Sequence, residues 1–184
     1  MKPTLIELAM KYHSDKLHWH SYIPKYEELF KGMEVKRLLE IGIGYRDLMK
    51  PFLPYEVEYV HGSSLKMWEE YFPEAEIFAC DIRLDTLINE GRIHSMVCDQ
   101  SDPFDLGIMC GLFGLVYQVI IDDGSHQYEQ QRLTARQLLR YCQPSLYIIE
   151  DVWLDTGELL AKEFGGELWK GEKGRDDNLV VIRK

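Results

Sequence analysis

Residues 37–44, with the sequence RLLEIGIG, decide the fold of this chain. A short apolar run that ends in glycines is typical of a buried strand at the point where it leaves a sheet. Similar apolar runs stand at residues 76–82, 94–100, 117–124 and 145–152, and NLVVIRK at 178–184 reads as the end of a hairpin. Segments with helical spacing of apolar residues separate them. This alternation predicts an α/β fold, in which a mostly parallel sheet carries helices on both faces.

Length and composition indicate one domain. The chain has 184 residues, of which 46% are hydrophobic and 28% charged, and it contains no internal repeat or low-complexity segment. We therefore expect a single domain over residues 1–184. Within it, residues 1–35 are expected to form helices and a segment that covers the ligand site.

The charge balance excludes several classes of function. Lys and Arg number 21 against 31 Asp and Glu, a net charge of −10, whereas nucleic-acid and membrane surfaces attract clustered basic residues. No apolar run approaches the roughly 20 residues that span a bilayer, and the first residues are too interrupted for a signal peptide. We interpret the cysteines as reduced core residues and expect a cytoplasmic protein. They are Cys80, Cys98, Cys110 and Cys142.

Carboxylates stand at the ends of five predicted strands. The carboxyl ends of parallel strands meet at one edge of a sheet, and ligands bind there in folds of this kind. We therefore predict an acidic ligand site at that edge. Its carboxylates are Glu40, Asp81, Asp99, Asp122, Asp123, Glu150 and Asp151.

The first three strand ends suit a ligand that contains adenosine. Gly42 and Gly44 let the backbone approach a ligand closely, but the third glycine of a dinucleotide-binding fingerprint is missing. Asp81 can accept hydrogen bonds from ribose hydroxyls, while Asp99 and Gln100 can offer an acceptor and an amide donor to an adenine edge. An acidic site fits S-adenosylmethionine, whose sulfonium is cationic, better than a dinucleotide.

The last two strand ends favour a metal ion. Neighbouring side chains of a strand face opposite ways, so Asp122 and Asp123 point to different faces. If the fourth and fifth strands are neighbours, Asp123, Glu150 and Asp151 converge, which is costly unless a cation neutralises them or one stays protonated. Oxygen ligands select a hard ion, Mg²⁺ first, with manganese left open. The alternative is that Glu150 and Asp151 cap the next turn.

His126 follows the fourth strand in the sequence DDGSH. We expect it at the start of the next helix, with Ser125 as the candidate N-cap, where the helix N-terminus disfavours the charged imidazolium. A neutral imidazole beside a metal cluster is a candidate general base. His13, His18 and His20 lack the register of metal ligands, so we interpret HSDKLHWH as a loop that covers the ligand.

Several of these segments together resemble one family. LLEIGIG, GSSLKMWEEYFP, the strand ends CDI and CDQ, IIDDGSH and YIIED look like the catalytic domain of magnesium-dependent macrolide-sugar O-methyltransferases, of the mycinamicin VI and demethylmacrocin type. SDKLHWHSYIPKYEELF is also similar to that family, so the resemblance runs from about residue 11 to the end of the chain. It implies a class I, Rossmann-like S-adenosylmethionine methyltransferase fold, with seven strands of which the last is antiparallel.

The resemblance also implies the site residues. S-adenosylmethionine would be held by Glu40, Gly42, Asp81, Asp99, Gln100 and Asp122, with Gly44 in the same turn. Its methionine end would be covered by Asp15 and Lys16, with Ser63 or Ser64. Mg²⁺ would be bound by Asp123, Glu150 and Asp151, and His126 would be the base.

The expected reaction is methyl transfer from S-adenosylmethionine to a hydroxyl of a small-molecule acceptor, of sugar or natural-product type, with metal assistance and a histidine base. Trp19, Tyr22 and Tyr55 are candidates for the roof of the acceptor pocket. Assembly into a homo-oligomer is left open. Three alternatives stay open as well: a nicotinamide-dependent oxidoreductase, a metal-dependent hydrolase, and a non-catalytic domain that binds the cofactor or a partner protein.

Overall fold

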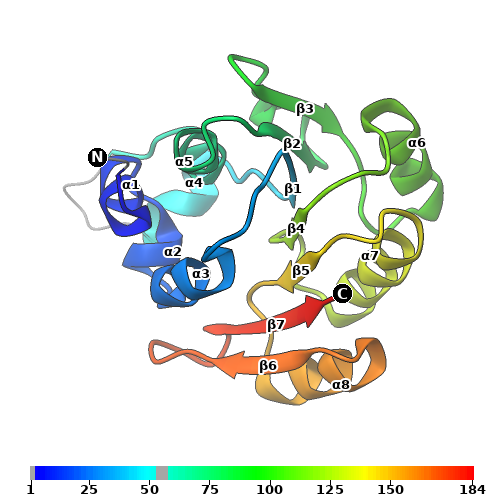
Figure 1. Cartoon of the computed structure of the whole chain (residues 1–184). Coiled ribbons are helices and arrows are strands. Elements are labelled where there is room, and N and C mark those ends of the chain that lie inside the picture. Colours follow the sequence, from blue (N-terminus) through cyan, green and yellow to red (C-terminus); the bar gives the residue numbers. More distant parts are fainter. Residues whose placement is uncertain (1–2, 53–57) are drawn as a thin grey trace.

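The computed structural model describes residues 3–52 and 58–184, and over these residues the chain forms a seven-stranded sheet (Figure 1). The strand order is β3-β2-β1-β4-β5-β7-β6. The first five strands pair in parallel, and β7 runs antiparallel to both β5 and β6. The predicted Rossmann-like methyltransferase fold, with an antiparallel last strand, is therefore confirmed. The strands are β1 (Arg37–Ile41), β2 (Glu76–Asp81), β3 (Ile93–Val97), β4 (Val119–Asp122), β5 (Leu146–Ile149), β6 (Glu167–Lys170) and β7 (Asn178–Arg183).

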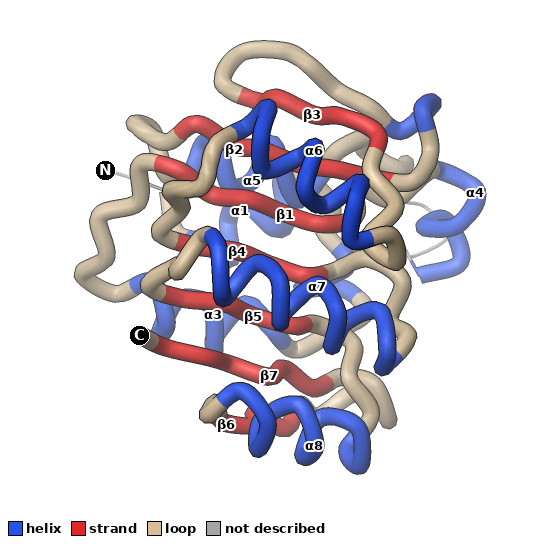
Figure 2. Tube along the Cα trace, turned by 90° about the vertical axis from the view of Figure 1, so that its right-hand side faces the viewer, coloured by secondary structure: helices blue, strands red, loops and turns tan. Residues whose placement is uncertain are grey.

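Helices cover both faces of the sheet. In Figure 2, α6, α7 and α8 lie in front of the strands, and α1, α3 and α5 lie behind them. None of the helices in the described residues is long and apolar enough to cross a membrane. The helices are α1 (Leu5–Lys11), α2 (Asp15–His18), α3 (Tyr22–Phe30), α4 (Arg46–Met49), α5 (Ser63–Tyr71), α6 (Pro103–Phe113), α7 (Tyr128–Tyr141) and α8 (Leu154–Phe164), with short 3₁₀ helices at Lys50–Phe52 and Leu84–Thr86.

The core consists of two apolar layers, one on each side of the sheet. Successive residues of one strand enter different layers: Leu38 packs on the side of α1, α3 and α5, and Leu39 packs on the side of α6 to α8. The central strands are buried on both faces, which is why their sequences read as continuous apolar runs. The same alternation separates the two acids at the end of β4.

Three helices were not anticipated from the sequence, namely α2, α4 and α6. Helix α6 is apolar on nearly all sides, so it lacks the periodicity that marks an amphipathic helix, although Asp102 caps it and Pro103 opens it. Helix α2 occupies part of the segment that we expected to be a loop. Its start signal is Ser14, whose hydroxyl accepts a hydrogen bond from the Lys16 amide at 3.3 Å.

Glu40 of β1 and Trp68 of α5 meet in the layer beneath the ligand edge. Both are fully buried, and the Trp68 indole Nε1 donates a hydrogen bond of 2.7 Å to the Glu40 carboxylate. The indole also packs against Tyr26 and Phe30, with ring centroids 5.2 and 5.6 Å away. The hydrogen bond therefore fixes α5 against the sheet and provides a partner for a buried carboxylate.

We expect Trp68→Phe to lower the free energy of unfolding by about 1–3 kcal/mol, because the buried carboxylate of Glu40 would lose its indole donor. Urea unfolding followed by far-UV circular dichroism measures the change. Trp153→Phe is the matched control, since Trp153 is 54% exposed and should leave the stability nearly unchanged. Equal stabilities of the two variants would show that this hydrogen bond contributes nothing.

Candidate functional site

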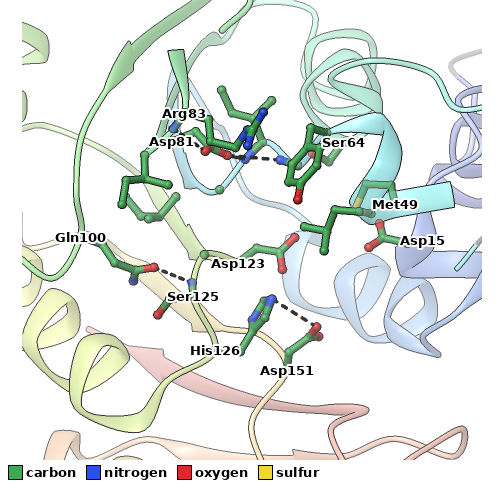
Figure 3. Close-up of a pocket in the computed structure, with 18 of the residues that line it drawn as sticks. Asp15, Met49, Ser64, Asp81, Arg83, Gln100, Asp123, Ser125, His126 and Asp151 are labelled. Atoms are coloured by element: carbon green, nitrogen blue, oxygen red, sulfur yellow. Dashed lines mark hydrogen bonds and ion pairs between the residues drawn. The ribbon is translucent and has the colours of Figure 1, made fainter. Parts of the chain in front are cut away.

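A cavity of about 460 Å³ opens at the carboxyl ends of the parallel strands, where the sequence predicted a ligand site (Figure 3). Four predicted site residues do not line it and lie behind its wall, namely Lys16, Glu40, Asp122 and Glu150. The other predicted site residues line it. These are Asp15, Gly42, Gly44, Ser63, Ser64, Asp81, Asp99, Gln100, Asp123, His126 and Asp151.

The turn after β1 brings backbone to the cavity surface. Gly42 has a φ of +95°, and a β-carbon there would clash with the carbonyl oxygen of Asp123, so only glycine fits. Asp81 at the end of β2 accepts hydrogen bonds from the amides of Ile43 and Gly44, at 2.9 and 3.3 Å. The carboxylate of Asp81 is thereby fixed at the cavity wall, at one end of the site.

Gln100 has its amide group engaged inside the protein. Its Nε2 donates to Asp122 at 3.0 Å and to Thr134 at 3.1 Å, and its Oε1 accepts from the Ser125 amide at 2.6 Å. This amide therefore joins the turn after β4 to α7. Burial raises the pKa of Asp122 to about 7, although the hydrogen bond from Gln100 acts in the opposite direction.

At the other end of the cavity, three side chains form a group with the geometry of a metal site. One ligand atom from each of Asp123, His126 and Asp151 lies within 4.8 Å of the other two. The His126 Nε2 stands 3.7 Å from an oxygen of Asp151 (Figure 3). His126 and Asp151 both have a φ of +55°, a left-handed conformation that turns them out of the regular elements beside them.

This left-handed conformation corrects one expectation. Helix α7 begins only at Tyr128, its N-cap is Gln127, and the N-cap forms no side-chain hydrogen bond. Ser125 is therefore not the cap, and His126 lies in the preceding loop because its positive φ is incompatible with a helix. The alternative role for Glu150 and Asp151 is not observed either, since α8 begins after Trp153 without a side-chain cap.

The two carboxylates at this end fit a hard divalent cation. Such ions prefer oxygen ligands and complete their coordination with water or substrate oxygens, whereas an imidazole such as that of His126 is a ligand more typical of transition metals. Burial, and next the carboxylate of Asp123, raises the pKa of Asp151 to about 7. A cation would relieve this repulsion and favour the ionised carboxylates.

Lys16 lies behind this group as a buried counter-charge. Its ammonium is 2.6 Å from Asp123, 2.7 Å from Glu150 and 3.4 Å from Glu40, and its side chain is fully buried. Glu150 also accepts a hydrogen bond from the Tyr26 hydroxyl. In this arrangement Glu150 points toward Lys16 and Tyr26, and the structure does not bring it into the group formed by Asp123, His126 and Asp151.

Two aromatic residues of the cavity wall come from the segment before α3. His20 and Trp19 line the cavity, and the Tyr22 hydroxyl donates to Asp151 at 2.7 Å. Of the residues expected in the roof, Trp19 is at the cavity, Tyr22 is buried beneath it, and Tyr55 is outside the described residues. The sequence placed His20 only within the loop expected to cover the ligand, although the H-x-Y pattern after SDK could have drawn attention to it.

Comparisons with known proteins agree with this geometry. No protein-family profile matches the chain. Demethylmacrocin O-methyltransferase of Streptomyces fradiae is 36% identical over 158 residues, which cover 83% of this chain and 37% of that protein. Mycinamicin VI 2''-O-methyltransferase of Micromonospora griseorubida is 34% identical with the same coverage. The chain is a relative of the macrolide-sugar O-methyltransferases.

The similarity to macrolide-sugar O-methyltransferases also holds for the three-dimensional fold, as a solved structure shows. The methyltransferase MycE of the mycinamycin pathway, in a complex with Mg, SAH and mycinamycin VI, superposes on all of this chain with a TM-score of 0.71 and 27% identity. The chain covers 54% of MycE and little more than a third of the two curated relatives. The resemblance inferred from the sequence motifs is confirmed.

We expect Glu40→Gln to flatten the dependence of stability on pH. Burial raises the pKa of Glu40 to about 7 from an ordinary 4.5, against the opposing effect of Lys16. The folded protein therefore binds this proton more tightly than the unfolded chain, so stability falls as the pH rises from about 4.5 to about 7. The glutamine variant lacks this contribution.

Urea unfolding at several pH values in that range measures the effect. Glu158→Gln, at an exposed position on α8, is the control and should keep the slope of the wild type. If the Glu40→Gln curve ran parallel to the wild-type curve, Glu40 would not titrate in this range.

Proposed function

We propose that this chain transfers a methyl group from S-adenosylmethionine to a hydroxyl of a small-molecule acceptor of sugar or natural-product type. The observation that carries the proposal is that one cavity contains both the glycine turn with Asp81 and the group Asp123, His126 and Asp151. The names of the relatives, which act on macrolide sugars, support the acceptor class.

The end of the cavity near Asp81 would hold the cofactor, which supplies the methyl group on a cationic sulfonium. Asp81 would accept hydrogen bonds from ribose hydroxyls and Asp99 would face the adenine. Ser63, Ser64 and Asp15, which line the cavity, would contact the methionine end. The close backbone at Gly42 and Gly44 leaves room for the ligand.

The predicted cofactor residues Glu40 and Asp122, which lie behind the cavity wall, would position residues that line the cavity. Glu40 holds α5 through Trp68, and the first residues of α5 are Ser63 and Ser64. Asp122 fixes the amide of Gln100, which in turn holds Ser125 beside His126. We therefore propose that Glu40, Asp122 and the Gln100 side chain shape the site without contacting the cofactor through their polar atoms.

Asp123 and Asp151 would bind a divalent cation, which acts as a Lewis acid toward an acceptor hydroxyl. Glu150, the third predicted ligand, is paired with Lys16 and would join them only if that pair opened. His126 is 39% exposed and faces the same space, so its imidazole can take the acceptor proton. One nitrogen cannot both bind a metal and accept a proton, and the experiments below separate these roles.

Two further properties remain predictions of the sequence. We propose a cytoplasmic protein, supported by four free cysteines, and one without a nucleic-acid partner, supported by the net charge of −10. Self-association stays open.

Calorimetric titration with S-adenosylmethionine and S-adenosylhomocysteine, in Mg²⁺ and again in excess chelator, tests the cofactor and the metal together. We expect both ligands to bind and Mg²⁺ to raise the melting temperature or the ligand affinity. Asp123→Asn should remove the Mg²⁺ effect, because it replaces a charged ligand by a neutral one. A protein that binds neither ligand in either condition would not be a methyltransferase.

His126→Ala should lower methyl transfer by about 10²–10⁴-fold if the imidazole is the general base. The affinity for S-adenosylmethionine and the response to Mg²⁺ should stay within about twofold of the wild type, a small fraction of the binding free energy. Loss of the Mg²⁺ response would instead make His126 a metal ligand. His94→Ala, outside the cavity, is the control.

A further inference from the structure

The turn between β6 and β7, residues 171–177, forms hydrogen bonds with the covering segment, residues 13–22. The Lys173 ammonium donates to the carbonyl oxygens of Leu17 at 2.6 Å, His20 at 2.9 Å and His18 at 3.4 Å. These carbonyls lie at and just after the C-terminal end of α2, where a cation is favoured by the helix dipole. One side chain of the turn therefore holds the end of the covering segment.

Asp177 makes the second connection, and its side chain is only 1% exposed. Its carboxylate accepts from the Ser21 amide at 2.9 Å, from the Ser21 hydroxyl at 2.6 Å and from the Lys173 amide at 2.7 Å. The Glu172 amide also donates to the Ser21 hydroxyl, at 3.1 Å. A buried carboxylate with this many donors fixes the two segments relative to each other.

These contacts place His20 at the Asp151 end of the cavity. The imidazole stacks on Tyr22 at a centroid distance of 4.6 Å, with Nε2 3.4 Å from Asp151 and Nδ1 3.4 Å from Asp177. His20 approaches Oδ1 of Asp151, whereas His126 approaches Oδ2. The two histidines therefore flank the same carboxylate.

The position of His20 is far from the part of the cavity that would take adenosine. In Figure 3, Asp81 and Asp151 lie at opposite ends of the site. Trp19 and Asp176, which come from the covering segment and from the turn, line the cavity together with His20. An aromatic ring, an imidazole and a carboxylate are the groups that contact the face and the hydroxyls of a sugar.

We propose that His20 is a specificity-determining residue that hydrogen-bonds a second hydroxyl of the acceptor, next to the one that is methylated, and that Lys173 and Asp177 are its positioning residues. The role of His20 rests on the proposed function. The positioning of the covering segment by Lys173 and Asp177 does not depend on it. The acceptor class is a sugar with two neighbouring hydroxyls. A site built to bind the second hydroxyl discriminates against an analogue that lacks it.

Hydrogen exchange measured by mass spectrometry tests the hold on the covering segment without any acceptor. In Lys173→Met, amides 14–21 should exchange at least about tenfold faster than in the wild type, because their local opening becomes easier. Lys173→Arg should restore part of the protection. Lys170→Met, an exposed lysine on β6, is the matched control and should match the wild type. Unchanged exchange in Lys173→Met would overturn the positioning role.

Kinetics test His20 with methyl α-L-rhamnopyranoside and its monodeoxy analogues. Wild type should prefer the intact sugar, and His20→Ala should reduce that preference about tenfold while S-adenosylmethionine affinity stays within about twofold. Lys173→Met should raise the acceptor KM more than it lowers kcat. An unchanged preference in His20→Ala overturns the assignment of His20. If the wild type binds S-adenosylmethionine but methylates none of these sugars, the role of His20 is overturned and the proposed function is not. If it also fails to bind S-adenosylmethionine, the proposed function is overturned too. The exchange experiment tests the turn in either case.

Discussion

One buried ammonium connects the N-terminal helices with the centre of the sheet. Lys16 contacts carboxylates from the ends of β1, β4 and β5, and neither it nor Glu40 and Glu150 is exposed. Burial alone would lower the pKa of Lys16, but its three carboxylate partners outweigh this and raise it well above its usual range. Without this charge the buried carboxylates of Glu40 and Glu150 would favour their protonated forms more strongly, so the covering segment is part of the fold as well as of the site.

The ion pairs with Lys16 also explain why the site has two layers. Lys16 and Tyr26 engage Glu150, and Lys16 fixes one oxygen of Asp123, so that only part of the acidic cluster faces the cavity. A buried ion pair contributes little net stability, but removing one partner leaves an unpaired charge at high cost. The ion pairs of Lys16 therefore contribute more to the geometry of the site than to the stability of the fold, because they orient Asp123 toward His126 and Asp151.

The sequence was informative where local pattern decides the structure. Apolar runs predicted five strands of a mostly parallel sheet. The period of two predicted that Asp122 and Asp123 face different ways, and in the structure one faces Gln100 and the other faces Lys16 and the cavity. The sequence was uninformative where contacts between residues far apart in the chain determine the structure. Lys16 and Glu150 are 134 positions apart, and no spacing rule indicates that they pair. The start of α7 was misjudged because a left-handed His126 depends on its tertiary contacts.

The same reasoning applies to the wall of the cavity near Asp151. Its parts come from residues close to the two ends of the chain, and Ser21 and Asp177 are separated by 156 positions. Apolar packing holds part of the covering segment, since Tyr22 belongs to the core and Leu17 packs against it, and polar contacts hold the segment to the turn. Such polar contacts are weak unless they are buried and numerous. Because Asp177 is buried and accepts several hydrogen bonds, it meets this condition. The wall near Asp151 therefore depends on the turn before β7, whereas the wall near Asp81 depends on the turn that follows β1.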